Sequence, residues 1–199
     1  MLNSNFIKLV FVSVSVISIL FLVPMMAAEK PQSIKKQTKS GKYLSAIEAY
    51  NLKQTKGQDL LFVDIRTPSE LVFVGTPENF DINIPFLTLD YKQWDEKKSS
   101  FKKIPNKQFL SGFSAVIQSK SLSKDTSVIL LCRSGKRSAK AANLLTTMGY
   151  SNVYTVVDGF EGDKEKAGNS KGKRGINGWK NAGLPWTYKL DRDSFQLDK

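Results

Sequence analysis

The chain has 199 residues, 41% hydrophobic and 24% charged, a balance typical of one globular domain and not of a disordered chain or a polytopic membrane protein. It has no histidine and one cysteine, Cys132, which excludes Ser-His-Asp and Cys-His catalytic pairs, intramolecular disulfides, and metal sites built from histidine or several cysteines. Its 30 basic against 18 acidic residues give a net charge of +12, which favours anionic ligands without choosing among nucleic acid, acidic lipid and small anions.

Residues 1–28 have the pattern of a signal peptide. Lys8 is the only charged side chain among them, and the uncharged stretch 9–28 ends at the small pair Ala27-Ala28. We expect cleavage after Ala28 and an exported, periplasmic protein. The alternative is an uncleaved membrane anchor, because the 20 residues of this stretch are enough to span a bilayer.

Residues 29–42 contain five lysines and no hydrophobic period, which predicts a basic, flexible linker. Tyr43, Ile47 and Tyr50 then recur at helical spacing, so we expect a short amphipathic helix that ends at Gly57. The folded part of the chain is therefore expected to begin near residue 43.

The middle of the chain carries two predicted strands and a helix. Residues 60–65 form a compact apolar run, typical of a buried parallel strand, and residues 82–89 hold a second strand limited by Pro85. Asn106 is placed to cap a helix whose apolar face extends from residue 109 to residue 117.

The clearest strand is 127–131, and it leads through a short loop into a strong helix at 139–148 that Gly149 stops. Another strand follows at 153–157, and the Gly- and Lys-rich stretch 158–178 is expected to be a loop insertion. Strands alternating with helices predict an α/β domain with a mainly parallel sheet, whose ligand crevice lies beyond the carboxyl ends of the strands.

The loop of residues 132–138, Cys-Arg-Ser-Gly-Lys-Arg-Ser, lies at such a carboxyl end. A short glycine-containing loop that enters a helix aims several backbone N–H groups at one point and adds the positive end of the helix dipole. This arrangement favours the thiolate of Cys132 over the thiol, with Lys136 and Arg137 adding positive charge. A nucleophilic cysteine therefore needs no histidine here.

These residues resemble the active-site loop of rhodanese-type sulfurtransferases, especially bacterial single-domain members with a C-R-x-G-x-R-S pattern. Three more segments resemble motifs of that family, in the family's order: 63–70, 83–85, and 157–160 with 178–185. The resemblance implies an α/β rhodanese-like domain over residues 43–190. Its central sheet would be mainly parallel and flanked by helices on both faces, with a C-terminal tail at 191–199.

The resemblance also implies a reaction. Cys132 would take sulfane sulfur from a small anionic donor (thiosulfate, polysulfide or a persulfide) and pass it, through a Cys132 persulfide, to a thiol, cyanide or a protein acceptor. The loop residues expected to bind substrate through amides and basic side chains are Arg133, Ser134, Gly135, Lys136, Arg137 and Ser138. The residues expected to brace the site, with Arg66 pairing with Glu70, are Asp64, Arg66 and Glu70. No cofactor, metal or nucleic acid is implied, and a membrane only if the N-terminal segment is uncleaved.

Two other interpretations stay open. A cysteine phosphatase or arsenate reductase has a similar architecture but needs C-x5-R, and here Arg137 comes one residue early, with Ser138 in the required place. A non-enzymatic persulfide carrier or binding module would use the same fold. Two stretches, 86–126 and 162–175, are longer than compact members of the family need. They lie where they can alter substrate access.

Overall fold

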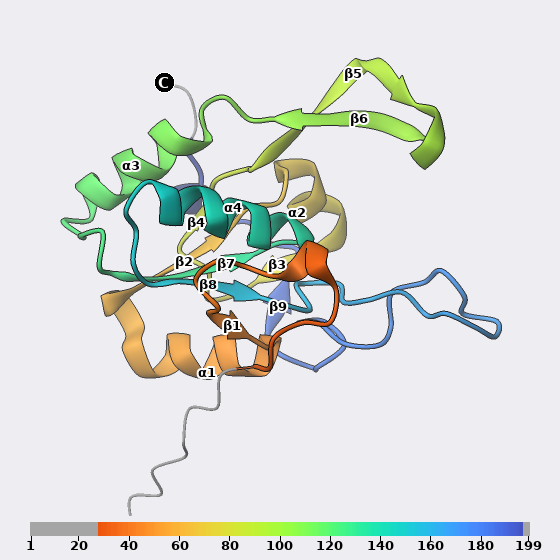
Figure 1. Cartoon of the computed structure of the whole chain (residues 1–199), viewed down its shortest axis with the longest axis horizontal. Helices are drawn as coiled ribbons and strands as arrows, with labels where there is room; N and C mark the ends of the chain where they lie inside the picture. Colours follow the sequence, from red (N-terminus) through yellow and green to blue (C-terminus); the bar gives the residue numbers. More distant parts are fainter. Residues whose placement is uncertain (1–27, 197–199) are drawn as a thin grey trace, which may run out of the picture.

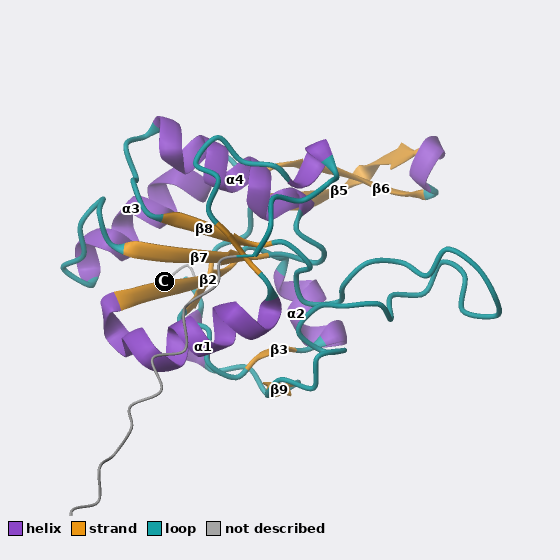
Figure 2. Cartoon of the chain, turned by 60° about the horizontal axis from the view of Figure 1, so that its bottom comes forward, coloured by secondary structure: helices purple, strands orange, loops and turns teal. Residues whose placement is uncertain are grey.

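Five parallel strands form the central sheet of the protein, in the order β1-β8-β7-β2-β4. This computed structural model describes residues 28–196. The strands are β1 (Tyr43–Leu44), β2 (Leu60–Asp64), β4 (Ile82–Asn83), β7 (Ser127–Leu131) and β8 (Val153–Val156). β2 pairs with β7 along its whole length, and all its residues are buried, because helices cover both faces of the sheet (Figures 1 and 2).

The helices divide the apolar residues into two cores, one on each face of the sheet. The helices α3 (Phe109–Ser119) and α4 (Lys136–Thr147) pack on one face, and α1 (Ala46–Lys56) packs on the other. Successive residues of a strand point to opposite faces, so Val63 belongs to the α3 and α4 core and Phe62 to the α1 core. The predicted α/β fold, with a parallel sheet and helices on both faces, is confirmed.

Most predicted elements are present, but some boundaries differ. The strands expected at 60–65, 127–131 and 153–157 are β2, β7 and β8. The strand expected within 82–89 and limited by Pro85 is β4, which ends at Asn83. A separate strand, β5, begins beyond the proline at Leu87, because Pro85 has no N–H to donate to a strand ladder. The last helix begins three residues before the predicted position 139, at Lys136.

The predicted apolar face of the first helix is also wrong. Tyr43 lies in β1, and Ile47 is 52% exposed. The buried apolar side chains of α1 are instead Ala46, Ala49 and Leu52. Alanines let a helix approach a sheet closely, yet they contribute little to a hydrophobic pattern. Gly57 does end the helix, as predicted.

The segments that flank the expected domain pack against it. Residues 29–42 were expected to form a flexible linker, but their 3-10 helix η1 (Ile34–Lys36) lies against α4, and Lys36 pairs with Asp163 at 2.7 Å. Part of the expected tail, η4 (Arg192–Ser194), packs on β4. The expected signal segment 1–28 lies outside the described residues except for Ala28. Within residues 28–196 no helix is both long and apolar enough to cross a membrane.

Two insertions project from the same side of the domain in Figures 1 and 2. The first is an antiparallel hairpin of β5 (Leu87–Asp95) and β6 (Ser100–Pro105), joined by η3 (Glu96–Lys98). The second is the long loop that contains residues 162–175. The remaining elements are α2 (Pro68–Val74), η2 (Gly57–Asp59), and a small antiparallel pair, β3 (Thr76–Pro77) with β9 (Trp186–Thr187). The insertions follow the carboxyl ends of β4 and β8, the edge of the sheet where ligands bind.

Candidate active site

Cys132 directly follows β7, and its sulfur contacts the first turn of α4. The residue is buried, with 2% of its surface exposed. The Ser138 amide donates a hydrogen bond to Cys132 Sγ at 3.4 Å, and Sγ lies 3.6 Å from Ser138 Oγ. Within residues 28–196, the amides of residues 133–137 make no hydrogen bond to Sγ. The first turn of α4 therefore contacts the sulfur through the Ser138 amide. A negative charge on the sulfur would be stabilised there, because the N-terminus of a helix carries partial positive charge.

Two glycines allow the backbone to close around this loop. Gly135 has φ of +84°, and a Cβ there would lie 2.1 Å from the Val157 carbonyl oxygen. Gly159 has φ of +67°, and its Cβ would lie 2.5 Å from the Cys132 carbonyl oxygen. The Phe160 amide donates to that same carbonyl at 2.8 Å. Any side chain at either glycine would push the chain after β8 away from the cysteine loop.

Glu70 holds Arg137 and joins α2 to α4. Arg137 Nη1 and Nη2 donate to the two Glu70 carboxylate oxygens at 2.7 and 2.6 Å, and Glu70 also completes the capping box of α2 with Thr67. Burial would raise the pKa of Glu70, but the hydrogen bond and charge of Arg137, with help from Lys103, lower it to about 2. The predicted Arg66–Glu70 pair is therefore wrong, and the charge of Arg137 is largely neutralised.

Asp64 and Arg66 form a second, fully buried ion pair. Arg66 Nη2 donates to Asp64 Oδ2 at 2.6 Å, and both side chains have no exposed surface. The Arg66 guanidinium stacks over the Phe160 ring, 4.1 Å from its centroid, and Asn83 Nδ2 donates to the carbonyls of both paired residues at 2.8 Å. This cluster braces the carboxyl end of β2 beside the chain that follows β8. The structural role predicted for these two residues beside the active site stays a prediction.

The other loop residues predicted to bind substrate differ in how far they are exposed to solvent. Ser134 is buried, Arg133 is half-buried, and Lys136 is exposed. Lys136 lines a cavity of about 460 Å³ together with Asp158 and Asp163, which lies against the η1 segment. Burial raises the pKa of Asp158. In the part of the chain that the structure describes, no three His, Cys, Asp or Glu side chains gather into a group that could hold a metal ion.

Two cations near the cysteine loop come from the insertions and were missed in the sequence. Lys103 is on β6, and Arg174 is in the loop after β8. Partial loss of solvent lowers the pKa of Lys103, while the charge of Glu70 raises it and that of Arg137 lowers it. Loss of solvent also lowers the pKa of Arg174, as does the nearby charge of Arg133. Each insertion contains several basic residues, and nothing in the sequence singled out these two.

Comparison with known proteins finds a matching family model and relatives that are shorter than this chain. A family model described as "Rhodanese-like domain" matches residues 45–166. The uncharacterized protein RP600 of Rickettsia prowazekii is 34% identical over 146 residues, which cover 73% of this chain and 96% of the relative. The thiosulfate sulfurtransferase GlpE of Tolumonas auensis is 44% identical over 41 residues, which cover 21% of this chain and 39% of that enzyme.

Solved structures give the same result. Rv0390 from M. tuberculosis aligns with a TM-score of 0.54 and 28% sequence identity, and the alignment covers 74% of this chain and 97% of that one. The part of this chain left outside that alignment is about a quarter of its length. The two chains therefore share a fold that extends over nearly the whole of the neighbour.

Proposed function

Because the chain belongs to the rhodanese-like family, we propose that it is a sulfurtransferase that carries sulfane sulfur on Cys132. The observation that supports this most strongly is the contact between the Cys132 sulfur and the Ser138 amide at the start of α4. A thiolate or persulfide anion at this position is stabilised by that donor and by the helix dipole. No histidine base is required, since the nearby charges hold the anion directly.

In the first half of the reaction, the Cys132 thiolate attacks the sulfane sulfur of a donor such as thiosulfate. A new S–S bond forms to Cys132, the S–S bond of thiosulfate breaks, and sulfite leaves with the electron pair. In the second half, a thiolate or cyanide attacks the outer sulfur of the persulfide. The Cys132–sulfur bond then breaks, and Cys132 returns to its thiolate.

Anionic donors are drawn to Cys132 by cations near the loop that, within residues 28–196, have no carboxylate at hydrogen-bond distance. Arg137 is neutralised by Glu70, so Arg133 of the loop and Lys103 of the hairpin provide the positive field, with Arg174 on the other side. Field strength falls with distance and salt, so donor capture should be more sensitive to these side chains, which lie near the cysteine loop, than to lysines farther from it.

The same geometry argues against a phosphatase or arsenate reductase. Those enzymes need an arginine six residues after the cysteine to hold a tetrahedral oxyanion, and that place is occupied by Ser138, which is fully buried. Ser138 Oγ donates to the Gly135 carbonyl at 2.9 Å, inside the loop. Arg137, one residue earlier, is held by Glu70 and cannot turn toward an oxyanion without breaking two hydrogen bonds.

The test combines turnover with mass spectrometry. The purified protein is incubated with thiosulfate, polysulfide or glutathione persulfide, and thiocyanate formation from cyanide is measured. We expect turnover with at least one donor and a reductant-sensitive gain of about 32 Da, one sulfur atom, on Cys132. Cys132→Ser, which keeps the loop but cannot carry the sulfur, should fold normally and lose both signals.

The outcomes separate the remaining interpretations. A persulfide that forms without turnover of any small acceptor would favour a carrier for a protein acceptor over an enzyme. Failure to form the adduct with every donor, or transfer by Cys132→Ser, would refute the sulfurtransferase proposal. A binding module with this fold would then take its place.

A further inference from the structure

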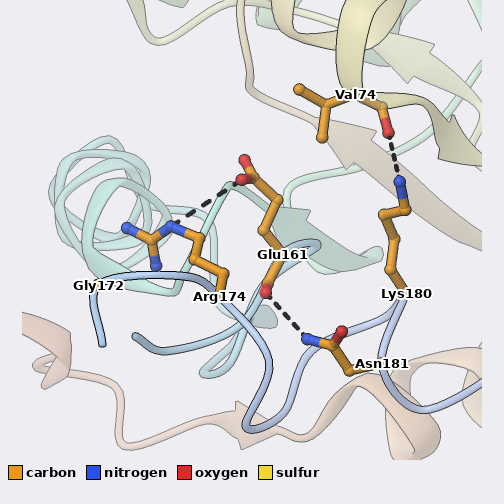
Figure 3. Close-up of a pocket in the computed structure, with 6 residues that line it drawn as sticks. All are labelled: Val74, Glu161, Gly172, Arg174, Lys180 and Asn181. Carbon is orange, nitrogen blue, oxygen red and sulfur yellow. Dashed lines mark hydrogen bonds and ion pairs between the residues drawn. The ribbon is translucent and has the colours of Figure 1, made fainter. Parts of the chain in front are cut away.

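A cavity of about 510 Å³ adjoins the cysteine loop, and neither half-reaction described above uses it (Figure 3). Its lining residues come from α2, the chain after β8 and the second insertion: Val74, Glu161, Gly172, Arg174, Lys180 and Asn181. The Glu161 amide donates to the Arg133 carbonyl at 3.0 Å, so one wall is bonded to the residue that follows Cys132. The volume lies in the range of small-molecule sites and exceeds what cyanide requires.

The cavity contains charges of both signs that are not fully paired with each other. Arg174 Nε lies 3.9 Å from Glu161 Oε2, beyond hydrogen-bond distance. Arg174 Nη1 donates to the Gly162 carbonyl, which fixes the guanidinium in place. Among residues 28–196, neither Arg174 Nη2 nor the Glu161 carboxylate makes a hydrogen bond, although their side chains are only 16% and 22% exposed.

A second cation lies across the cavity from Arg174. Lys180 Nζ donates to the Val74 carbonyl at 3.0 Å and lies 3.7 Å from the centroid of the Trp186 ring. Figure 3 shows Glu161 between Arg174 and Lys180, with the space of the cavity beside it. The Glu161 carboxylate and the Arg174 guanidinium are partly exposed and have free hydrogen-bonding positions on the same cavity, so together they fit a ligand that carries both charges.

We propose that this cavity binds the amino-acid head group of a small thiol that accepts sulfur from Cys132. Arg174, aided by Lys180, would hold the ligand's carboxylate, and Glu161 would hold its ammonium group. The inference rests on the proposed sulfurtransferase activity. The acceptor thiolate forms a bond to the outer sulfur while the Cys132 S–S bond breaks; the electron pair returns to Cys132, and the product is a small persulfide. No oxidant or reductant enters this step.

The first experiment compares acceptors in single turnover. The protein is loaded with sulfur from polysulfide, and loss of the 32 Da adduct, one sulfur atom, is followed with four thiols at equal thiolate concentration. Cysteine carries both charged groups, cysteamine lacks the carboxylate, 3-mercaptopropionate lacks the amine, and 2-mercaptoethanol lacks both. We expect cysteine to saturate the protein at a concentration about tenfold lower than the other three. Glutathione, run in parallel, distinguishes a peptide thiol from the single amino acid.

The second experiment uses variants of the cavity. Arg174→Gln should raise the half-saturating concentration of cysteine about tenfold and remove the difference between cysteine and cysteamine. Glu161→Gln should remove the difference between cysteine and 3-mercaptopropionate. Lys173→Gln is the matched control, because Lys173 is an exposed residue of the same loop and its loss changes the net charge equally. It should leave the acceptor preference unchanged.

The failure of this inference is distinguishable from the failure of the proposed function. If the persulfide forms but cysteine reacts no better than 2-mercaptoethanol, or Lys173→Gln acts as strongly as Arg174→Gln, the acceptor site is refuted while sulfur transfer stands. Calorimetric titration with S-methylcysteine, which cannot accept sulfur, tests the cavity without turnover. Binding that Arg174→Gln abolishes supports the site, and absence of binding to the wild type overturns it.

Discussion

Glu70→Gln tests whether the ion pair between α2 and α4 stabilises the protein. The paired side chains of Glu70 and Arg137 are only 16% and 11% exposed, so solvent screens their interaction little. The pKa of Glu70 falls from an ordinary 4.5 to about 2, which corresponds to a stabilisation of about 3 kcal/mol at neutral pH. Loss of the carboxylate also leaves the buried side of Arg137 without its partner.

The sign of the pH dependence follows from the lowered pKa. A carboxylate with a depressed pKa stabilises the fold fully above its unfolded value of 4.5, and the contribution is lost as the pH falls toward 2. Urea unfolding of wild type and Glu70→Gln should therefore differ by about 3 kcal/mol at pH 7 and by about half of that at pH 3. A difference that does not change between these pH values would refute the electrostatic explanation.

The matched control is Asp95→Asn on the hairpin. Asp95 pairs with Lys98 at 2.5 Å, but Lys98 is 76% exposed, and such surface pairs contribute little to stability. We expect no measurable change in the urea midpoint for this variant. If Asp95→Asn destabilised the protein as much as Glu70→Gln, burial of the Glu70 pair would not be the reason for its strength.

Three further predictions concern donor capture, loop geometry and export. Lys103→Gln should raise the half-saturating concentration of thiosulfate about fivefold at low salt and less at high salt, while Lys107→Gln, an exposed control, should not; equal effects would contradict the positive field. Gly135→Ala should destabilise the protein by about 3 kcal/mol in urea unfolding, and Gly168→Ala, with φ of +70° in open space, by about 1 kcal/mol. Intact mass should show a mature chain beginning after Ala28; full-length protein in the cytoplasm would contradict export.

The sheet and the cysteine loop could be predicted because their sequence signals are local. The runs 60–65 and 127–131 are continuously apolar, as strands buried on both faces must be, and the loop that begins at Cys132 is short, with its glycine in the one backbone conformation that the turn requires. These features depend on neighbours in sequence. Packing against the rest of the chain reinforces them without changing them.

The partner of Glu70 could not be predicted, because it is a product of the fold. Arg66 lies four residues from Glu70, whereas Arg137 lies 67 residues away, and spacing alone favours the nearer arginine. Arg66 forms a buried ion pair with Asp64 at the end of β2. Glu70 is therefore available to pair with Arg137 of the cysteine loop. Two carboxylates, Asp64 and Glu70, compete for the nearby arginines, so the partner of each can be predicted only when the three-dimensional arrangement is known.

The order of strands in the sheet explains why two insertions distant in sequence can both act on Cys132. β7, which ends at the cysteine, lies between β8 and β2, and β4 follows beyond β2. Any segment added after β8 therefore flanks the cysteine loop on one side, and any segment added after β4 flanks it on the other. The loop after β8 supplies Arg174, and the hairpin supplies Lys103. Arg137 is neutralised by Glu70, so in the proposed reaction the choice of donor and acceptor would fall to residues in the insertions, which can change without disturbing the sheet.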